Sequence, residues 1–98
     1  MCNNNIESLL TEKEKLIQDI KQKTDELTDK KYEIKTMETN LVNNVDLKAR
    51  GITNKDKRKA YLDENTLKQK HERDMLQNEL SDLKRRLDLC NDKLKLFI

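Results

Sequence analysis

The chain has 98 residues, of which 41% are charged and 34% hydrophobic, and it contains one glycine and no proline. A chain of this length forms at most one domain, and its shortage of turn residues argues against an all-β fold. No apolar stretch is long enough to span a membrane, and the first residues lack the basic and apolar regions of a secretion signal. We therefore expect an all-α protein that is cytoplasmic and makes no use of a membrane.

The first predicted helix covers residues 5–47. Its apolar residues recur at steps of three, four and seven, which is the spacing of one helix face. One seven-residue repeat, which Lys13 interrupts, comprises Ile6, Ile20, Leu27, Ile34 and Leu41. Asn4 followed by Glu7 resembles a capping box at the start of this helix, and Thr11 followed by Glu14 offers a later start.

A turn is predicted over residues 48–54, which contain the only glycine of the chain. Gly51 can adopt the left-handed backbone conformation that ends a helix. Either Thr53 or Asn54 can then cap the next helix. The Asn43-Asn44 pair weakens the helix just before this turn.

The second predicted helix covers residues 55–97. Its last part carries a heptad seam with alternating steps of four and three residues: Leu76, Leu80, Leu83, Leu87, Cys90, Leu94 and Phe97. Towards the turn the same positions are polar, at Thr66, Gln69 and Arg73, before Leu62 resumes the pattern. We expect this polar part to pack less tightly.

These elements predict that residues 1–98 form a single antiparallel two-helix coiled-coil hairpin. Folding about Gly51 places opposite each other residues whose numbers add up to about 102, so that Lys30 faces the region of Glu72. A continuous parallel coiled coil is the alternative, against which Gly51 and the broken heptad phase argue. Because two helices bury only one stripe each, we expect a homo-oligomer, a dimeric or larger helical bundle. Leu89, Leu96 and Ile98 lie off the seam and could supply the second stripe that a bundle needs.

The sequence thus predicts a non-enzymatic structural or adaptor protein that acts through helix–helix interaction. The partner of the seam is its own first helix, a second copy or an unidentified protein. The expected interface residues are Ile6, Leu9, Ile17, Ile20, Leu27, Leu76, Leu80, Leu83, Leu87 and Leu94.

The residues that carry enzyme chemistry are scarce. The single histidine, His71, lies in the charged stretch Lys70-His71-Glu72-Arg73, which is typical of a solvated helix face rather than of a catalytic base. Cys2 and Cys90 form no metal-binding motif, and Cys90 occupies a core position of the seam as a free thiol. We expect no catalytic residue, metal or cofactor.

A basic segment around the turn suggests an alternative function. Residues 46–61 hold six basic and two acidic residues, a net charge of +4, although the whole chain carries only +2. The basic residues are Lys48, Arg50, Lys55, Lys57, Arg58 and Lys59. They could bind the phosphates of a nucleic acid without reading its sequence, although Tyr61 is the only aromatic residue near enough to stack on a base.

The stretch from Gly51 to Leu62 also resembles a pattern found in small, uncharacterised phage and prophage helical-hairpin proteins. In that pattern a glycine and a Thr/Ser-Asn pair precede a helix with matching positions at Asn54, Arg58, Ala60 and Leu62. The resemblance covers 51–62 well and about 40 residues loosely. It implies a small accessory protein, encoded near phage replication or recombination functions and present in the host-cell cytoplasm, with no established activity.

Overall fold

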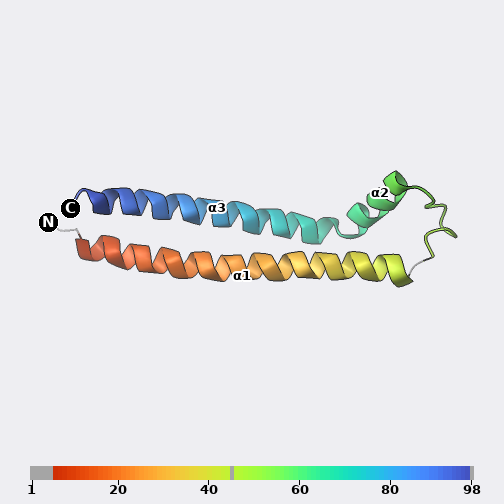
Figure 1. The fold of residues 1–98 in the computed structure, drawn as a ribbon, viewed down its shortest axis with the longest axis horizontal. Helices are drawn as coiled ribbons and strands as arrows, with labels where there is room; N and C mark the ends of the chain where they lie inside the picture. Colours follow the sequence, from red (N-terminus) through yellow and green to blue (C-terminus); the bar gives the residue numbers. More distant parts are fainter. Residues whose placement is uncertain (1–5, 45, 98) are drawn as a thin grey trace. The chain divides into compact units, whose positions relative to one another are not determined.

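The computed structural model describes residues 6–44 and 46–97, which contain three helices and no strand. The helices are α1 (Ile6–Asn44), α2 (Lys55–Asn65) and α3 (Leu67–Lys95) (Figure 1). The predicted all-α fold is therefore confirmed. The proposed capping residue Asn4 and the proposed stripe residue Ile98 lie outside the described residues.

Helix α1 ends at Asn44, three residues before the end that the apolar pattern predicts. Residues 47–51 form a turn with its own hydrogen bonds. The Asp46 carboxylate accepts a bond from the Ala49 amide at 3.1 Å, as the cap of a single helical turn does. The predicted end of the first helix at residue 47 is therefore wrong, because Asp46 and Leu47 make the hydrogen bonds of this turn.

The turn closes at Gly51, whose φ of +76° confirms the predicted left-handed conformation. The amide of Gly51 donates to the carbonyl of Lys48 at 3.0 Å, and that of Ile52 donates to the carbonyl of Leu47 at 2.8 Å. This pair of bonds is the Schellman motif, in which an apolar pair, here Leu47 and Ile52, flanks the bonds. The motif satisfies carbonyls that water would otherwise have to bind.

Of the two predicted capping residues, Thr53 and Asn54, it is Asn54 that caps the N-terminus of α2. Its side-chain oxygen accepts a hydrogen bond from the Lys57 amide at 2.8 Å. Its backbone is extended, which is the usual conformation of a capping residue. The start of α2 at Lys55 coincides with the predicted start of the second helix.

The single second helix predicted over residues 55–97 is wrong in two respects, because Thr66 divides it into α2 and α3 and because α3 ends at Lys95. Thr66 has φ −121° and ψ 13°, outside the helical region. Its hydroxyl donates to the Leu62 carbonyl at 2.7 Å, and its amide bonds the same carbonyl at 3.1 Å. A threonine hydroxyl that bonds the carbonyl four residues earlier often bends a helix. Since the Thr66 side chain is fully buried, its hydroxyl needs such a partner.

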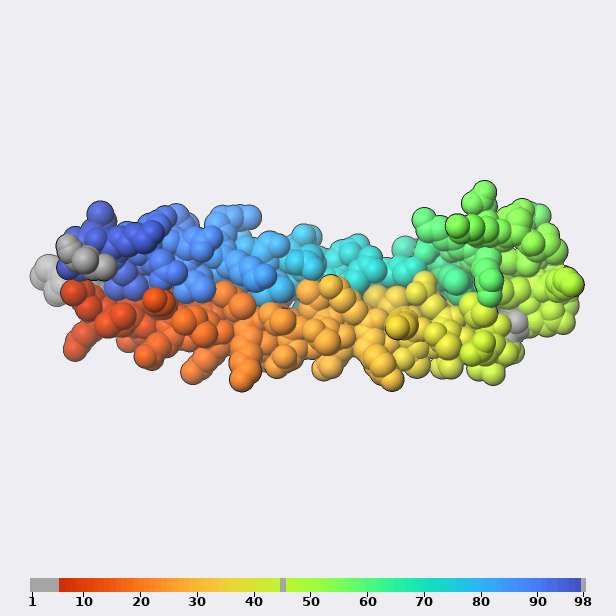
Figure 2. Space-filling view, in the orientation of Figure 1, coloured from red at the N-terminus to blue at the C-terminus, as the bar shows by residue number. Residues whose placement is uncertain are grey.

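The chain divides into two compact units. The terminal unit contains α1 up to Glu26 and α3 from Leu76 onward, and the turn unit contains Leu27–Met75. The terminal unit buries Leu16, Leu80 and Cys90, and the turn unit buries Leu27, Ile34 and Thr66. Within the terminal unit the start of α1, red to orange, lies against the end of α3, blue (Figure 2).

In both units α1 contacts α3 with opposite chain direction. In the terminal unit Leu9 contacts Cys90 and Lys23 contacts Glu79. In the turn unit Lys30 contacts Glu72 and Glu38 contacts Lys70. In each case the residue number on α3 falls as the number on α1 rises, so the helices are antiparallel within each unit.

Candidate functional site

The heptad seam of α3 faces α1 in both units. In the terminal unit Leu80 and Cys90 are buried, and the other seam leucines, Leu76, Leu83, Leu87 and Leu94, are half-buried. Phe97, the last position of the predicted seam, is 52% exposed. In the turn unit the same spacing continues through Thr66, Gln69 and Arg73, all buried or half-buried. The spacing on α3 therefore marks one inward face, although the residues on it change from apolar to polar.

The expected interface residues of α1 have three different environments. Leu27 is buried, Leu9 and Ile20 are half-buried, and Ile6 and Ile17 are 45% and 48% exposed. The buried Leu16 and Ile34 were not among the expected interface residues, nor was Cys90 on α3. Ile6 and Ile17 thus lie at the margin of the face that α3 covers.

The inward face of α1 consists of two heptad series, and every member is buried or half-buried. The series are Leu9, Leu16, Lys23, Lys30 and Met37, and Lys13, Ile20, Leu27, Ile34 and Leu41. A steady alternation of steps of four and three could have revealed both series in the sequence. Three lysines at these positions conceal it from a search for apolar residues.

Two of these lysines reach carboxylates on α3. Lys23 Nζ lies 2.6 Å from Glu79 Oε2, and Lys30 Nζ lies 3.0 Å from Glu72 Oε2 and 2.7 Å from Glu33 Oε2. A lysine can bury its alkyl stem in a seam while its ammonium group reaches a partner at the edge. The numbers of the pairs Lys23–Glu79 and Lys30–Glu72 both add up to 102, the sum expected for a chain folded about Gly51.

These contacts favour the charged form of each partner. Hydrogen bonds to Glu33 and Glu72 raise the pKa of Lys30, and the hydrogen bond from Lys30 lowers the pKa of Glu72. The hydrogen bond to Glu79 likewise raises the pKa of Lys23. Because these side chains are partly exposed, each pair adds little stability but disfavours a shifted alignment of the helices.

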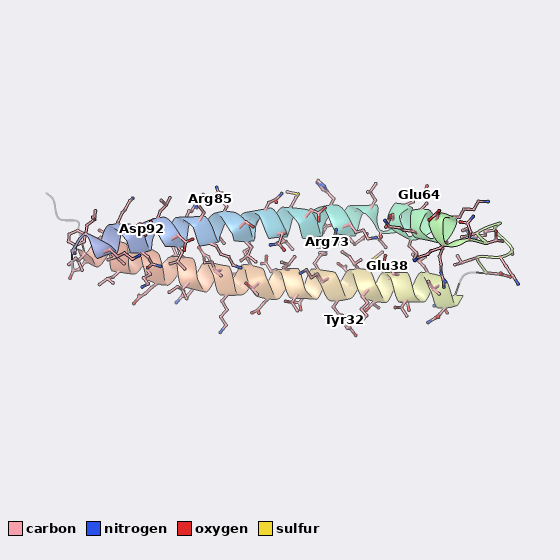
Figure 3. The ribbon with its side chains drawn as sticks, turned by 45° about the horizontal axis from the view of Figure 1, so that its top comes forward. Tyr32, Glu38, Glu64, Arg73, Arg85 and Asp92 are labelled. Atoms are coloured by element: carbon pink, nitrogen blue, oxygen red, sulfur yellow. The ribbon has the colours of Figure 1, made fainter. Side chains whose placement is uncertain are left out.

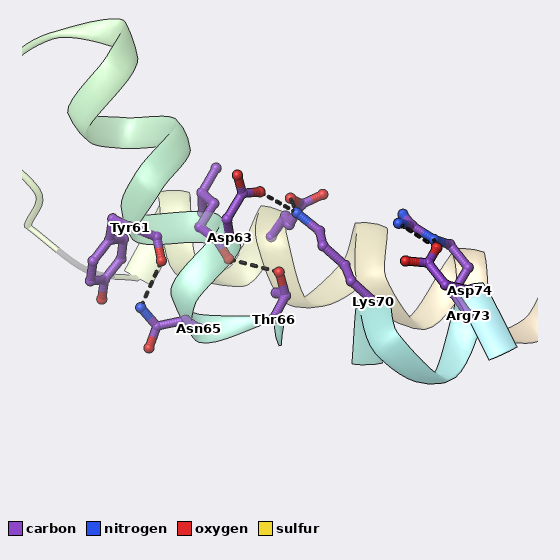
Figure 4. A network of polar contacts seen from close by, with 9 residues as sticks. Tyr61, Asp63, Asn65, Thr66, Lys70, Arg73 and Asp74 are labelled. Carbon is purple, nitrogen blue, oxygen red and sulfur yellow. Dashed lines mark hydrogen bonds and ion pairs between the residues drawn. The ribbon is translucent and has the colours of Figure 1, made fainter. Parts of the chain in front are cut away.

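Another lysine, Lys70 of α3, contacts acidic residues of the two other helices in the turn unit. Its Nζ lies 2.6 Å from Asp63 Oδ1 at the end of α2 and 3.1 Å from Glu38 Oε2 on α1. The hydrogen bond with Asp63 is the main cause of the raised pKa of Lys70 and of the lowered pKa of Asp63. Figure 4 shows the Asp63–Lys70 pair beside the buried Thr66, so the helix break and the ionic contacts occur together.

Two labelled side chains of α1 in the turn unit, those of Tyr32 and Glu38, lie on opposite sides of the helix (Figure 3). Figure 3 shows Glu38 on the side of α1 that faces α3, and Tyr32 pointing away from it. Tyr32 is 73% exposed. Asn65, beside the helix break, donates from its side-chain amide to the Tyr61 carbonyl at 2.8 Å.

Cys90 is a buried free thiol, as its position in the seam predicts. Its Sγ donates a hydrogen bond to the Leu9 carbonyl at 3.3 Å. Cys2 lies outside the described residues. Among the residues that the structure describes, no group of three or more histidine, cysteine, aspartate or glutamate residues could hold a metal ion.

All six basic residues of the segment 46–61 are exposed and lie in the turn unit. None of them forms an ion pair with another described residue. Three of them, Lys48, Lys55 and Arg58, line a hollow of about 470 Å³ together with the capping residues Asp46 and Asn54. The segment therefore presents unpaired positive charge around the start of α2.

No family model, curated protein or solved structure matches this chain. None of the helices described is long and apolar enough to cross a membrane. The two features of the chain that bear on its function are the apolar helix faces and the basic segment.

Proposed function

We propose that the protein is a coiled-coil hairpin that acts as a structural or adaptor protein by pairing its helices with those of other chains. The antiparallel contacts in each unit support a hairpin over a continuous parallel coiled coil. A parallel coiled coil would not bring Lys30 and Glu72, 42 positions apart in the sequence, within 3.0 Å in one chain.

The observation that carries the proposal is the amount of apolar side chain left exposed in the terminal unit. Six large apolar residues are 45–84% exposed: Ile6, Leu10, Ile17, Leu89, Leu96 and Phe97. Isolated exposed apolar residues are ordinary on a protein surface, but six along the two helices of one small unit are more apolar exposure than a pair of helices with no further neighbour needs. The exposure of Leu89 and Leu96 agrees with the second stripe expected from the sequence.

Sedimentation equilibrium of the full chain tests the proposal. We expect a mass of at least two chains that falls on dilution. Leu83→Glu places a charge in the half-buried seam and should dissociate or unfold the protein, whereas Ser81→Glu, at an exposed position two residues away, should do neither. A Leu83→Glu variant with unchanged mass and helicity would contradict the proposal.

The basic segment supports a second candidate, a nucleic-acid-binding accessory factor. Its six exposed and unpaired basic residues cluster around the N-terminus of α2, where helix amides add to the positive potential. The segment offers phosphate contacts without a stacking platform, so binding should be weak, independent of base sequence and sensitive to salt.

Fluorescence anisotropy with labelled single- and double-stranded DNA tests this second candidate. Replacing Lys55, Lys57 and Arg58 by alanine should abolish binding at low salt. Replacing the exposed residues Lys84, Arg85 and Arg86 of α3 removes the same charge elsewhere and should have a smaller effect. Equal losses in the two triple variants would indicate a general charge effect and would exclude a site at the turn.

A further inference from the structure

The apolar face of α1 in the terminal unit is wider than the face that α3 covers. Leu9, Leu16 and Ile20 form an inner row that is buried or half-buried. Ile6, Leu10 and Ile17 form an outer row that is 45–48% exposed. Since successive residues of an α-helix turn by about 100°, the two rows together span about 120° of the helix. A face of this width is typical of a helix with two neighbours, whereas a two-stranded coiled coil needs a narrower stripe.

The spacing of the outer row fits a second copy of itself. With Lys13 between them, Ile6, Leu10 and Ile17 follow steps of four, three and four, which read the same in both directions. Two antiparallel copies of α1 would place Ile6 opposite Ile17 of the second copy. The same alignment would place Leu10 opposite Lys13 of that copy.

The charges beside the outer row are complementary in this arrangement. Lys13 is half-buried and makes no ion pair with another described residue, although Asp88 and Asp92 line the same hollow. In the antiparallel alignment, Lys13 would lie opposite Leu10 of the second copy, which Glu7 and Glu14 flank on the helix surface. Each copy would thus offer exposed carboxylates to the lysine of the other, as Glu72 and Glu79 do for Lys30 and Lys23 within one chain.

We infer that two copies of the chain associate through the outer row of α1, antiparallel and about a two-fold axis between Leu10 and Lys13. The α1 and α3 segments of two terminal units then form a four-helix bundle with Ile6, Leu10 and Ile17 in its interior. This inference rests on the proposed function and adds to it the surface, the partner and the alignment.

The test compares three proteins by sedimentation equilibrium and circular dichroism. The wild-type chain should be a dimer, and Ile17→Glu should weaken dimerisation by at least about a hundredfold because it buries a charge between the copies. Met75→Glu adds the same charge at an apolar residue of α3 that is similarly exposed, at 49%, but lies in the turn unit, and should leave the dimer intact. Both variants should keep their helicity, since neither residue is buried in the single chain.

Disulfide formation tests the alignment independently, in a chain with Cys2→Ser and Cys90→Ala. The double variant Ile6→Cys, Ile17→Cys should form dimers linked by disulfides. Ile6→Cys alone should not, because the two copies of residue 6 would be about 16 Å apart along antiparallel helices and a disulfide needs Cα atoms within about 7 Å.

The outcomes separate this inference from the proposed function. If the wild-type chain associates but Ile17→Glu and Met75→Glu behave alike, or Ile6→Cys crosslinks alone, the alignment is wrong and the proposed helix pairing stands. A wild-type chain that stays monomeric at every concentration would contradict self-association and the alignment together.

Discussion

Replacing Leu80 by alanine should cost the protein a large part of its stability. Leu80 lies on the seam of α3 in the terminal unit and is only 4% exposed. Truncating a buried leucine removes its apolar contacts and leaves a cavity, at a cost of about 2–5 kcal/mol. Because a unit built from two helices can partly close around the cavity, we expect a value near the lower limit, about 2–3 kcal/mol. For a chain of this size the loss corresponds to a fall of about 10–20 °C in Tm.

Thermal and urea unfolding followed by circular dichroism measure this loss, at one protein concentration because self-association shifts the midpoint. Leu89→Ala is the matched control, because Leu89 lies on the same helix but is 55% exposed. It should lose less than about 1 kcal/mol. Equal losses of stability in the two variants would show that the seam does not form the core of the terminal unit.

Three further predictions concern polar residues of the turn unit. Asn54→Ala should lower the free energy of unfolding by about 1 kcal/mol, as urea unfolding can measure, and Asn54→Asp should not, because it keeps the capping oxygen that accepts from Lys57. Lys30→Leu should raise the free energy of unfolding, because it places an apolar side chain at a half-buried seam position and leaves behind two carboxylates, those of Glu33 and Glu72, that are exposed enough for water to solvate them; a fall would show that the pairs with Glu33 and Glu72 outweigh packing. The pKa of Glu72 is lower in the folded chain than in the unfolded chain, so its contribution is present above the unfolded pKa and is lost as the pH falls through the folded pKa. Glu72→Gln should therefore lose less stability between neutral and acidic pH than the wild-type chain does, and identical pH profiles would contradict this assignment.

Features set by neighbouring residues could be predicted from the sequence. The all-α fold follows from the apolar periodicity, and the conformation of Gly51 follows from its lack of a Cβ atom. The cap at Asn54 also depends only on groups within three residues of it. The inward face of α3 could be predicted because leucines occupy most of its positions in the terminal unit.

The inward face of α1 and the break at Thr66 depend on groups distant in the sequence or on burial. In the sequence, an apolar stripe is interrupted by Lys13, Lys23 and Lys30. In the structure, Lys23 and Lys30 fit into it because Glu79 and Glu72 lie across from them. Thr24, which is exposed, makes the same hydroxyl bond to the carbonyl four residues earlier without a break in α1, whereas Thr66 is fully buried at the break. The sequence alone therefore determined which segments are helical and where the chain turns, because those depend on local hydrogen bonds and side-chain spacing. The tertiary structure decided which polar residues enter the seam, because burial of a charge or a hydroxyl depends on the partner that packing brings to it.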